Sequence, residues 1–251
     1  MVSLSHLTAY LRDYLRLDEI PDFSASWNGL QIENEGEVTR IAAAVDSHLP
    51  VVRKAVEENA DLLLVHHGLF WNGIQPFQGA MREKLKLALD HNLSLYSAHH
   101  PLDVHPVVGN NALLAKSLGL SGGTGFFPYK GTPIGLQFEG SWAREEFTRS
   151  LTELFGTAPI LAPGGPETIQ RLGICTGGAG GEIQSVRQEG VDTFLTGEGP
   201  HWSFPLAEEL GINLYYAGHY ATETFGVKAL AQHLAEEFDL SWFFVDHPTG
   251  L

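Results

Sequence analysis

The sequence predicts an α/β protein made of two linked α/β domains, related by an internal repeat, with a metal site in the cleft between them. Two observations carry this prediction. Strand and helix signals alternate almost throughout the chain, and one strand–helix–strand unit occurs twice. Alternating elements with short connections indicate a mainly parallel sheet, whose binding sites lie at the carboxyl ends of its strands.

The first half of the chain begins with an amphipathic helix and continues as strand–helix pairs. Ser3 or Ser5 is the expected cap of the first helix, and Pro50 suits the first turn of the second. The run 62–67 is continuously apolar up to its histidines, as expected for a parallel strand covered on both faces. Helices are expected at 3–16, 50–59, 79–91 and 109–118, and strands at 41–46, 62–67 and 93–99.

The second half repeats the alternation after a turn-rich stretch at 121–133, which we expect to be a domain crossing. The first domain is therefore placed at 1–125 plus 220–251, and the second at 126–219. Strands are expected at 134–139, 171–176, 193–198, 213–218 and 241–247, and helices at 143–154, 181–189, 203–210 and 222–237.

The composition excludes several classes of protein. The chain has 15 Lys+Arg against 30 Asp+Glu, and a formal net charge of −15 disfavours duplex nucleic acid and anionic membranes as partners. The single cysteine, Cys175, indicates a reducing compartment, so we expect a cytoplasmic protein. No apolar run approaches the roughly 20 residues that cross a bilayer, and the N-terminus lacks the features of a signal peptide.

The repeat is visible as two pairs of similar stretches. ENADLLLVHHG (58–68) resembles EGVDTFLTGEG (189–199), and HNLSLYSAHHPLD (91–103) resembles GINLYYAGHYATE (211–223). Two such copies facing each other bring their polar ends into one cleft. The matched residues are Asp61 with Asp192, His66-His67 with Gly197-Glu198, Tyr96 with Tyr216, His99 with His219, and Asp103 with Glu223.

The adjacent histidines His66 and His67 are the first candidate metal ligands. Neighbouring side chains of an extended strand point to opposite faces, so the two cannot both face one metal ion unless the strand ends there. Gly68 makes such an end plausible. The alternative is that each histidine serves a different ion of a pair.

Two histidine–carboxylate pairs share one spacing, His99 with Asp103 and His219 with Glu223. Imidazole and carboxylate together form the mixed N/O shell that suits Zn, Fe, Mn, Co or Ni. For the second pair the spacing fits one helical turn, with Thr222 as the expected helix cap. Taken alone, Asp103 is equally well explained as the residue that stabilises a turn.

The segment GEGPHW (197–202) adds Glu198 and His201 beyond a strand end. They are candidate ligands, a general acid/base pair, or groups that orient ligands, and we favour the last two roles. The glycines of GGAGGE (177–182) suit anion binding or tight packing equally well. Cys175 lies within an apolar strand and is expected to be a buried, inert thiol.

Several blocks of the sequence together resemble the NIF-three-like family of dinuclear-metal-centre hexameric proteins, often catalogued as GTP cyclohydrolase 1 type 2 homologues. The blocks recur in the order of that family and extend over nearly the whole chain. One departure occurs at His100-Pro101, where the family more often has threonine followed by a small or polar residue. The blocks are WNGLQ (27–31), VD (45–46), ADLLLVHHGLFW (60–71), YSAHHPLD (96–103), GNNALLA (109–115), TGEGPHW (196–202) and GHYATE (218–223).

The resemblance implies two divalent metal ions per chain, of unknown identity, and a toroidal homohexamer whose sites face an inner cavity. The implied metal ligands are His66, His67, Asp103, His219 and Glu223, with Glu223 or Asp103 bridging the ions, and His99 lies near them. The candidates for transferring protons or orienting the ligands are Glu198, His201 and His99.

The implied function is a metal-dependent hydrolase that acts on nucleotides or related small molecules, because paired cations lower the pKa of water and hold it for attack. The alternative is a metal-binding hexameric scaffold or metal carrier without turnover, binding a nucleic-acid strand in its cavity if the lining there is locally basic. An open coordination position favours the hydrolase, whereas saturated ions favour the scaffold.

Overall fold

The computed structural model describes residues 1–71, 73 and 75–251. The chain divides into two compact units, the first comprising residues 1–108 and 226–247 and the second residues 109–225 and 248–251. The domain bounds expected from the sequence stay predictions beside these. No helix in the described part of the chain is long and apolar enough to cross a membrane.

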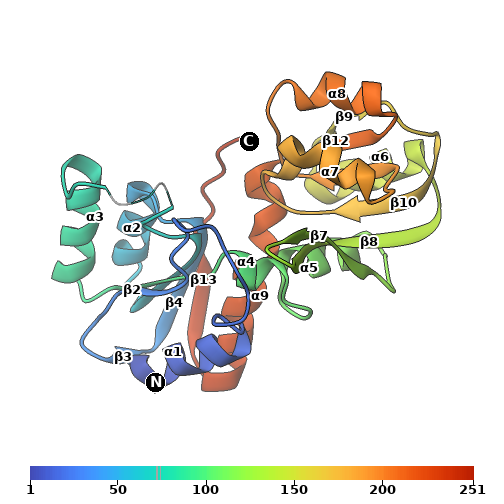
Figure 1. The fold of residues 1–251 in the computed structure, drawn as a ribbon. Helices are drawn as coiled ribbons and strands as arrows, with labels where there is room; N and C mark the ends of the chain where they lie inside the picture. Colours follow the sequence, from blue (N-terminus) through green and yellow to red (C-terminus); the bar gives the residue numbers. More distant parts are fainter. Residues whose placement is uncertain (72, 74) are drawn as a thin grey trace. The chain divides into compact units, whose positions relative to one another are not determined.

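The first unit is built on a sheet in which the strand order is β13-β4-β5-β6-β2 (Figure 1). Neighbours are parallel from β13 to β6, and β2 pairs antiparallel with β6 at the edge. A separate antiparallel pair joins β1 to β3. The strands are β1 (Val2–Ser3), β2 (Gly29–Ile32), β3 (Glu37–Val38), β4 (Arg40–Asp46), β5 (Leu62–His67), β6 (Ser94–Ser97) and β13 (Ser241–Phe244).

Helices cover this sheet because its strands are apolar on both faces. Helices α2 (Leu49–Glu57) and α3 (Gly79–Asp90) lie side by side on one face (Figure 1). Their apolar side chains pack on alternate residues of β4 and β5 and on Leu95 of β6. Helix α1 (Leu4–Tyr14) begins at Ser3, whose hydroxyl accepts the N–H of His6 at 3.2 Å. Of the two expected caps, Ser3 is the one used.

The second unit has a mixed sheet of order β7-β8-β10-β11-β12-β9. The central strands β10, β11 and β12 are parallel, and antiparallel strands flank them on both sides. The strands are β7 (Thr124–Tyr129), β8 (Thr132–Ala143), β9 (Ile160–Pro163), β10 (Thr168–Ile174), β11 (Thr193–Thr196) and β12 (Asn213–Tyr216).

Helices α5 and α6 bury one face of this second sheet, since their apolar residues cluster with those of β8 and β10. Helix α9 begins in the second unit, and its residues from Gly226 onward belong to the first. The helical segments here are α5 (Asn110–Ser117), α6 (Arg144–Phe155), the 3₁₀ turn η1 (Ala179–Glu182), α7 (Ile183–Gln188), α8 (Ser203–Leu210) and α9 (His219–Phe238).

The predicted α/β fold with an internal repeat is confirmed. Three parallel strands followed by an antiparallel edge strand occur in each sheet, as β4-β5-β6-β2 and as β10-β11-β12-β9. The matched aspartates even make the same contacts. Asp61 Oδ2 accepts the N–H groups of Thr39 and Arg40, and Asp192 Oδ2 accepts those of Gln170 and Arg171. Each carboxylate thus binds two consecutive N–H groups of the neighbouring strand, at the start of β4 and within β10.

Several expectations about single elements are wrong. The stretch 121–133 is not merely turn-rich, because β7 lies within it and pairs with β8 as a hairpin. Helix α9 begins at His219 instead of 222, so Thr222 lies inside the helix and is not its cap. Thr222 Oγ1 instead donates to His219 O at 3.0 Å and accepts the N–H of Gly177 at 3.1 Å.

Candidate metal centre

In the first unit, His66 and His67 form the carboxyl end of β5 and are both buried. Despite the alternation of the strand, one ring nitrogen from each of His66, His67 and His99 lies within 4.8 Å of the others. The strand ends at His67, which allows the two neighbours to converge. This arrangement favours the first of the two sequence alternatives, in which both histidines face one location.

Each of these three imidazoles is held at Nδ1 by an oxygen atom. His66 Nδ1 lies 2.8 Å from Ala98 O, His67 Nδ1 lies 2.9 Å from Asp46 Oδ1, and His99 Nδ1 lies 2.9 Å from Asp22 Oδ1. Carbonyl and carboxylate oxygens accept only, so Nδ1 carries the proton and Nε2 carries the lone pair. Metal-binding histidines characteristically have this second contact, which fixes tautomer and ring orientation.

The carboxylate of Asp22 accepts most of the hydrogen bonds that hold His99 and its neighbours in place. Besides the His99 ring, its carboxylate accepts the N–H groups of Phe23 and His100 and the side-chain amide of Asn28. Burial opposes the charge, but the hydrogen bonds from His99 and Asn28 outweigh it and hold the pKa of Asp22 well below its usual value. Burial also lowers the pKa of His99 to about 4, so the imidazole is neutral at pH 7.

Gly68 explains why the apolar strand can end immediately after its histidines. A Cβ at this position would lie 2.2 Å from Gln31 Nε2. Gln31 in turn accepts the N–H of Leu69 at 2.6 Å and donates to Trp27 O at 2.6 Å. The glycine therefore lets the Gln31 amide lie against the chain where it leaves the sheet and hold Leu69, the second residue beyond the strand.

Asp103 reaches the same region through a short helix, α4 (His100–Asp103), which the sequence did not predict. The backbone N–H of Asp103 donates to His99 O, and Asp103 Oδ2 lies 3.5 Å from His66 Nε2. His100 stacks on His99 with ring centroids 4.5 Å apart. The unusual histidine at 100 thus supports a neighbouring ring, and Trp71 closes the other side with its centroid 4.4 Å from that of His99.

In the second unit, His219 and Glu223 lie on the first turn of α9. His219 Nε2 lies 3.1 Å from Glu223 Oε2, and its Nδ1 lies 2.8 Å from Glu198 Oε1. The pattern of a ring nitrogen fixed by a carboxylate thus recurs here. Two glycines allow the close packing: a Cβ on Gly177 would lie 2.2 Å from Glu223 Oε1, and one on Gly197 would lie 2.6 Å from His219 Cα.

The charge state of His219 is set by its two carboxylates. Burial alone lowers its pKa, but the hydrogen bonds and negative charges of Glu223 and Glu198 overcome this and raise the pKa to about 9. In the absence of a cation the ring is therefore an imidazolium at pH 7. A proton on Nε2 then occupies the position that a metal ion would take.

This proton predicts a pH dependence of the metal-free protein. Because the pKa of His219 is about 9 in the folded chain and about 6.5 in the unfolded one, its contribution to stability is complete below pH 6.5 and is lost as the pH rises through 9. Thermal melts of metal-free protein between pH 6 and 10 are expected to show this loss. The loss shrinks in His219→Gln; an identical pH profile in that variant would contradict the assignment.

The remaining candidate, His201, is exposed on the turn before α8 and lines a cavity together with Glu198. Packing explains two of the glycines in 177–182, because a Cβ on Gly177 would lie 2.2 Å from Glu223 Oε1 and one on Gly180 would lie 2.8 Å from Glu198 O. Cys175 is buried as expected. Its Sγ lies 3.8 Å from Ile134 O.

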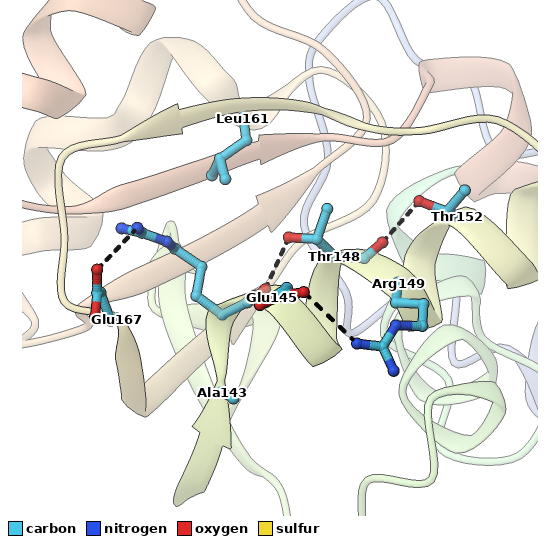
Figure 2. Close-up of a pocket in the computed structure, with 8 residues that line it drawn as sticks. Ala143, Glu145, Thr148, Arg149, Thr152, Leu161 and Glu167 are labelled. Carbon is cyan, nitrogen blue, oxygen red and sulfur yellow. Dashed lines mark hydrogen bonds and ion pairs between the residues drawn. The ribbon is translucent and has the colours of Figure 1, made fainter.

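A second cavity of about 630 Å³ lies along the start of α6. Figure 2 shows Arg149 facing Glu145, with 3.8 Å between the charged groups. The other arginine of the lining, Arg144, lies 4.0 Å from Glu167. The Arg144 guanidinium also donates to Gly165 O at 3.2 Å. None of the candidate metal ligands lines this cavity, so it belongs to the framework of the unit.

The same chain-wide pattern is found in known proteins. The family model described as Duf34/NIF3 (NGG1p interacting factor 3) matches residues 2–249. The chain belongs to the Duf34/NIF3 family. A Duf34/NIF3 relative from Deinococcus radiodurans, named GTP cyclohydrolase 1 type 2 homolog, is 41% identical over 100% of this chain and 95% of its own length. Another from Pyrococcus abyssi with the same name is 40% identical over 98% of each.

Solved structures agree with this Duf34/NIF3 assignment. A protein from Thermus thermophilus shares 40% identity and a TM-score of 0.90 over the full length of both chains. Reduced HcgD from Methanocaldococcus jannaschii shares 28% identity and a TM-score of 0.86 over 98% of each.

Sequence reasoning named the ligand candidates of this Duf34/NIF3 member but not all of the carboxylates that orient them. Asp46 is the last residue of the predicted strand 41–46, and its place at a strand end was the available signal; the structure pairs it opposite His67 in the parallel register. Asp22 has no such signal, because it lies 77 residues from His99 in a segment without periodicity. The structure shows that buried His, Asp and Glu groups of this chain can hold a metal ion.

Proposed function

We propose that this protein is a divalent-metal-dependent hydrolase that acts on nucleotides or related small molecules. The observation that carries the proposal is the fixing of Nδ1 in His66, His67, His99 and His219 by an oxygen acceptor. This contact presents Nε2 as the ligand atom of His66, His67 and His219 and as the basic atom of His99. Relatives that align over the whole chain are named GTP cyclohydrolase 1 type 2 homologs, which supports a nucleotide-like substrate.

The donor set fits a divalent transition metal. Neutral imidazole and carboxylate form a mixed N/O shell that suits Zn, Fe, Mn, Co or Ni. Within the described part of the chain, thiolate ligation has no support, because the only cysteine is buried in the β10 region of the second unit. The ligands in this proposal are His66, His67, Asp103, His219 and Glu223, and about two ions per chain are expected.

The chain's own residues would prepare such a site for hydrolysis. Cations bound there would supply Lewis acidity and lower the pKa of water. Asp46 fixes the ring of His67 and Ala98 O fixes that of His66, while Asp22 holds the proton of His99 on Nδ1 and leaves its basic atom at Nε2. Burial keeps the His99 imidazole neutral. His99 can then accept a proton at Nε2, and the Asp22 carboxylate stabilises the resulting imidazolium.

Glu198 is the corresponding group in the second unit. Its Oε1 holds His219 Nδ1, and its side chain is 40% exposed, so substrate and water reach it. We assign Glu198 to orienting His219 and to proton transfer at its carboxylate. His201, exposed beside it, is a second proton carrier for the leaving group.

The test is a screen of metal-reconstituted protein against nucleotides, phosphoesters and cyclic amidines. Turnover is expected with the unmodified protein and is expected to be lost in His67→Ala and Glu223→Ala. Exposed residues of the same types provide matched controls, His91→Ala in the first unit and Glu209→Ala in the second. Activity that survives both ligand substitutions would overturn the proposal.

Metal binding without turnover on any substrate would instead favour the scaffold or carrier. The toroidal homohexamer also stays a prediction, and sedimentation equilibrium tests it.

A further inference from the structure

We propose that the crevice between the carboxyl ends of β4 and β13 binds a phosphate group. Three side chains of the first unit form this site, His48, His247 and Lys84, and none of them is a candidate metal ligand. Binding there requires neither a metal ion nor turnover, so it goes beyond the function proposed above.

The crevice lies where the strand order of the first sheet reverses. From β4 the chain proceeds through β5 to β6 in one direction, whereas β13 pairs with the other side of β4. Helix α2, which follows β4, packs on one face of the sheet together with Phe243. Trp242 and Phe244 alternate with Phe243 and contact α9 on the opposite face (Figure 1). Ligands of open α/β sheets bind at such a reversal, outside the carboxyl ends of the strands.

Two imidazoles from the neighbouring strands meet at this crevice. His48 lies two residues beyond the end of β4 and is the N-cap residue of α2, and His247 lies three residues beyond the end of β13. Their ring centroids are 4.4 Å apart, and the ring planes are inclined by 58°. Because a neutral imidazole carries one N–H and an imidazolium carries two, the pair presents hydrogen-bond donors from both strand ends.

Lys84 of α3 supplies a positive charge that no carboxylate neutralises. Burial, and then the charges of His247 and Lys84, lower the pKa of His48, so the three side chains lie together. The other lysines of α2 and α3, Lys54 and Lys86, each form an ion pair with a carboxylate. Among the residues that the structure describes, Lys84 has no such ion pair, and burial lowers its pKa. An anion beside it would stabilise the half-buried ammonium group.

The start of α2 adds to the positive potential. The His48 side chain makes no capping hydrogen bond, and the first turn contains no acidic residue, so the positive end of the helix dipole is not compensated there. Two carboxylates nearby act on other groups. Asp46 Oδ1 lies 2.9 Å from His67 Nδ1, and the charge of Asp246 acts on Lys228.

These donors select the class of ligand. They come from α2, α3 and the segment after β13, and they can converge on an anion with acceptor oxygens on several sides. A phosphate group is such an anion, and ammonium, imidazole and helix N-terminal N–H groups are its usual partners in proteins. The free phosphate ion and a phosphate monoester share this chemistry.

The experiment titrates the Zn-loaded full chain with inorganic phosphate and, separately, with glycerol phosphate, and follows the histidine ring signals by NMR. The variants His48→Gln and His247→Gln assign the two signals. Both anions are expected to shift them, and uncharged glycerol is not. Lys84→Gln is expected to weaken binding about tenfold or more, because a charged donor is lost. Lys86→Gln, on the same helix, is the matched control and leaves binding unchanged.

The two anions distinguish the sources of the phosphate group. Tighter binding of glycerol phosphate assigns the site to a phosphorylated molecule, and tighter binding of inorganic phosphate assigns it to the free ion. Shifts confined to the signals of His66 and His67 would place the anion at the metal centre and overturn the proposal. Equal affinity of Lys84→Gln and Lys86→Gln for both anions would overturn it as well.

Discussion

Replacing Asp22 with alanine is expected to weaken metal binding by about 10–100-fold, the usual effect of removing a carboxylate that orients a histidine at a metal site. The ring that Asp22 orients, His99, packs on the ligand His66 with ring centroids 4.8 Å apart. It is also expected to lower the free energy of unfolding by about 3 kcal/mol or more, because four hydrogen-bond donors, three of them in part-buried contacts, lose a charged acceptor at once. Those donors are His99 Nδ1, the N–H groups of Phe23 and His100, and the Asn28 amide.

Two further variants make the Asp22 result interpretable. Asp22→Asn retains one carbonyl oxygen and is expected to recover part of the stability. Asp18→Ala removes an aspartate nearby in the chain that is exposed and pairs with Arg12, so it changes stability by less than about 1 kcal/mol. Metal titration and urea unfolding give the two quantities. If Asp22→Ala behaved like Asp18→Ala in both, its assigned role would be wrong.

Replacing Gly177 with alanine is expected to lower the free energy of unfolding by about 2–4 kcal/mol. The residue has φ of +72°, and an added Cβ would lie 2.2 Å from Glu223 Oε1. A left-handed conformation costs a residue with a Cβ roughly 1–2 kcal/mol, and the clash adds to this. Gly177 O also accepts the N–H groups of Gly197 and Glu198 at 2.8 and 3.0 Å, so the backbone has little freedom to move away.

The matched control for this change is Gly181→Ala. A Cβ at Gly181 meets its nearest atom, in Pro200, at 3.5 Å, which is ordinary contact. Its stability is expected to stay within about 0.5 kcal/mol of the unmodified protein. Because Gly177→Ala displaces Glu223, it is also expected to lower metal occupancy. Equal stability of the two variants in chemical unfolding would show that the close approach to Glu223 is not a constraint.

The central strands were predictable because their apolar runs are uninterrupted. LLLVHH becomes β5 at the predicted bounds, and the match of Asp61 with Asp192 identifies strand starts that are alike in hydrogen bonding. The edge elements were not predictable. Strands such as β1 and β3 have two residues each, too short for periodicity to appear, and β7 is held by its pairing with β8 instead of by local propensity.

The candidate site likewise has a part that the sequence predicts and a part that it does not. The sequence shows histidines and carboxylates at strand ends, and it shows the one-turn spacing of His219 and Glu223. In the structure these two side chains lie together. The groups that orient these ligands are brought to them by tertiary contacts between residues far apart in the sequence. Asp22 reaches His99 across 77 residues, and Gly68 is required by the side chain of Gln31, 37 positions earlier in the printed sequence. Contacts of this kind depend on the folded sheet and leave no local pattern.

Metal content tests most directly whether His66, His67 and His219, whose rings are fixed by oxygen acceptors, bind metal together with Asp103 and Glu223. Protein reconstituted with Zn, Fe, Mn, Co or Ni and freed of loose ions is analysed by mass spectrometry for metal per chain. About two ions per chain are expected, with clear loss in His66→Ala and in Glu223→Ala and no change in the control His91→Ala. Metal content that is the same in all four proteins would contradict the account.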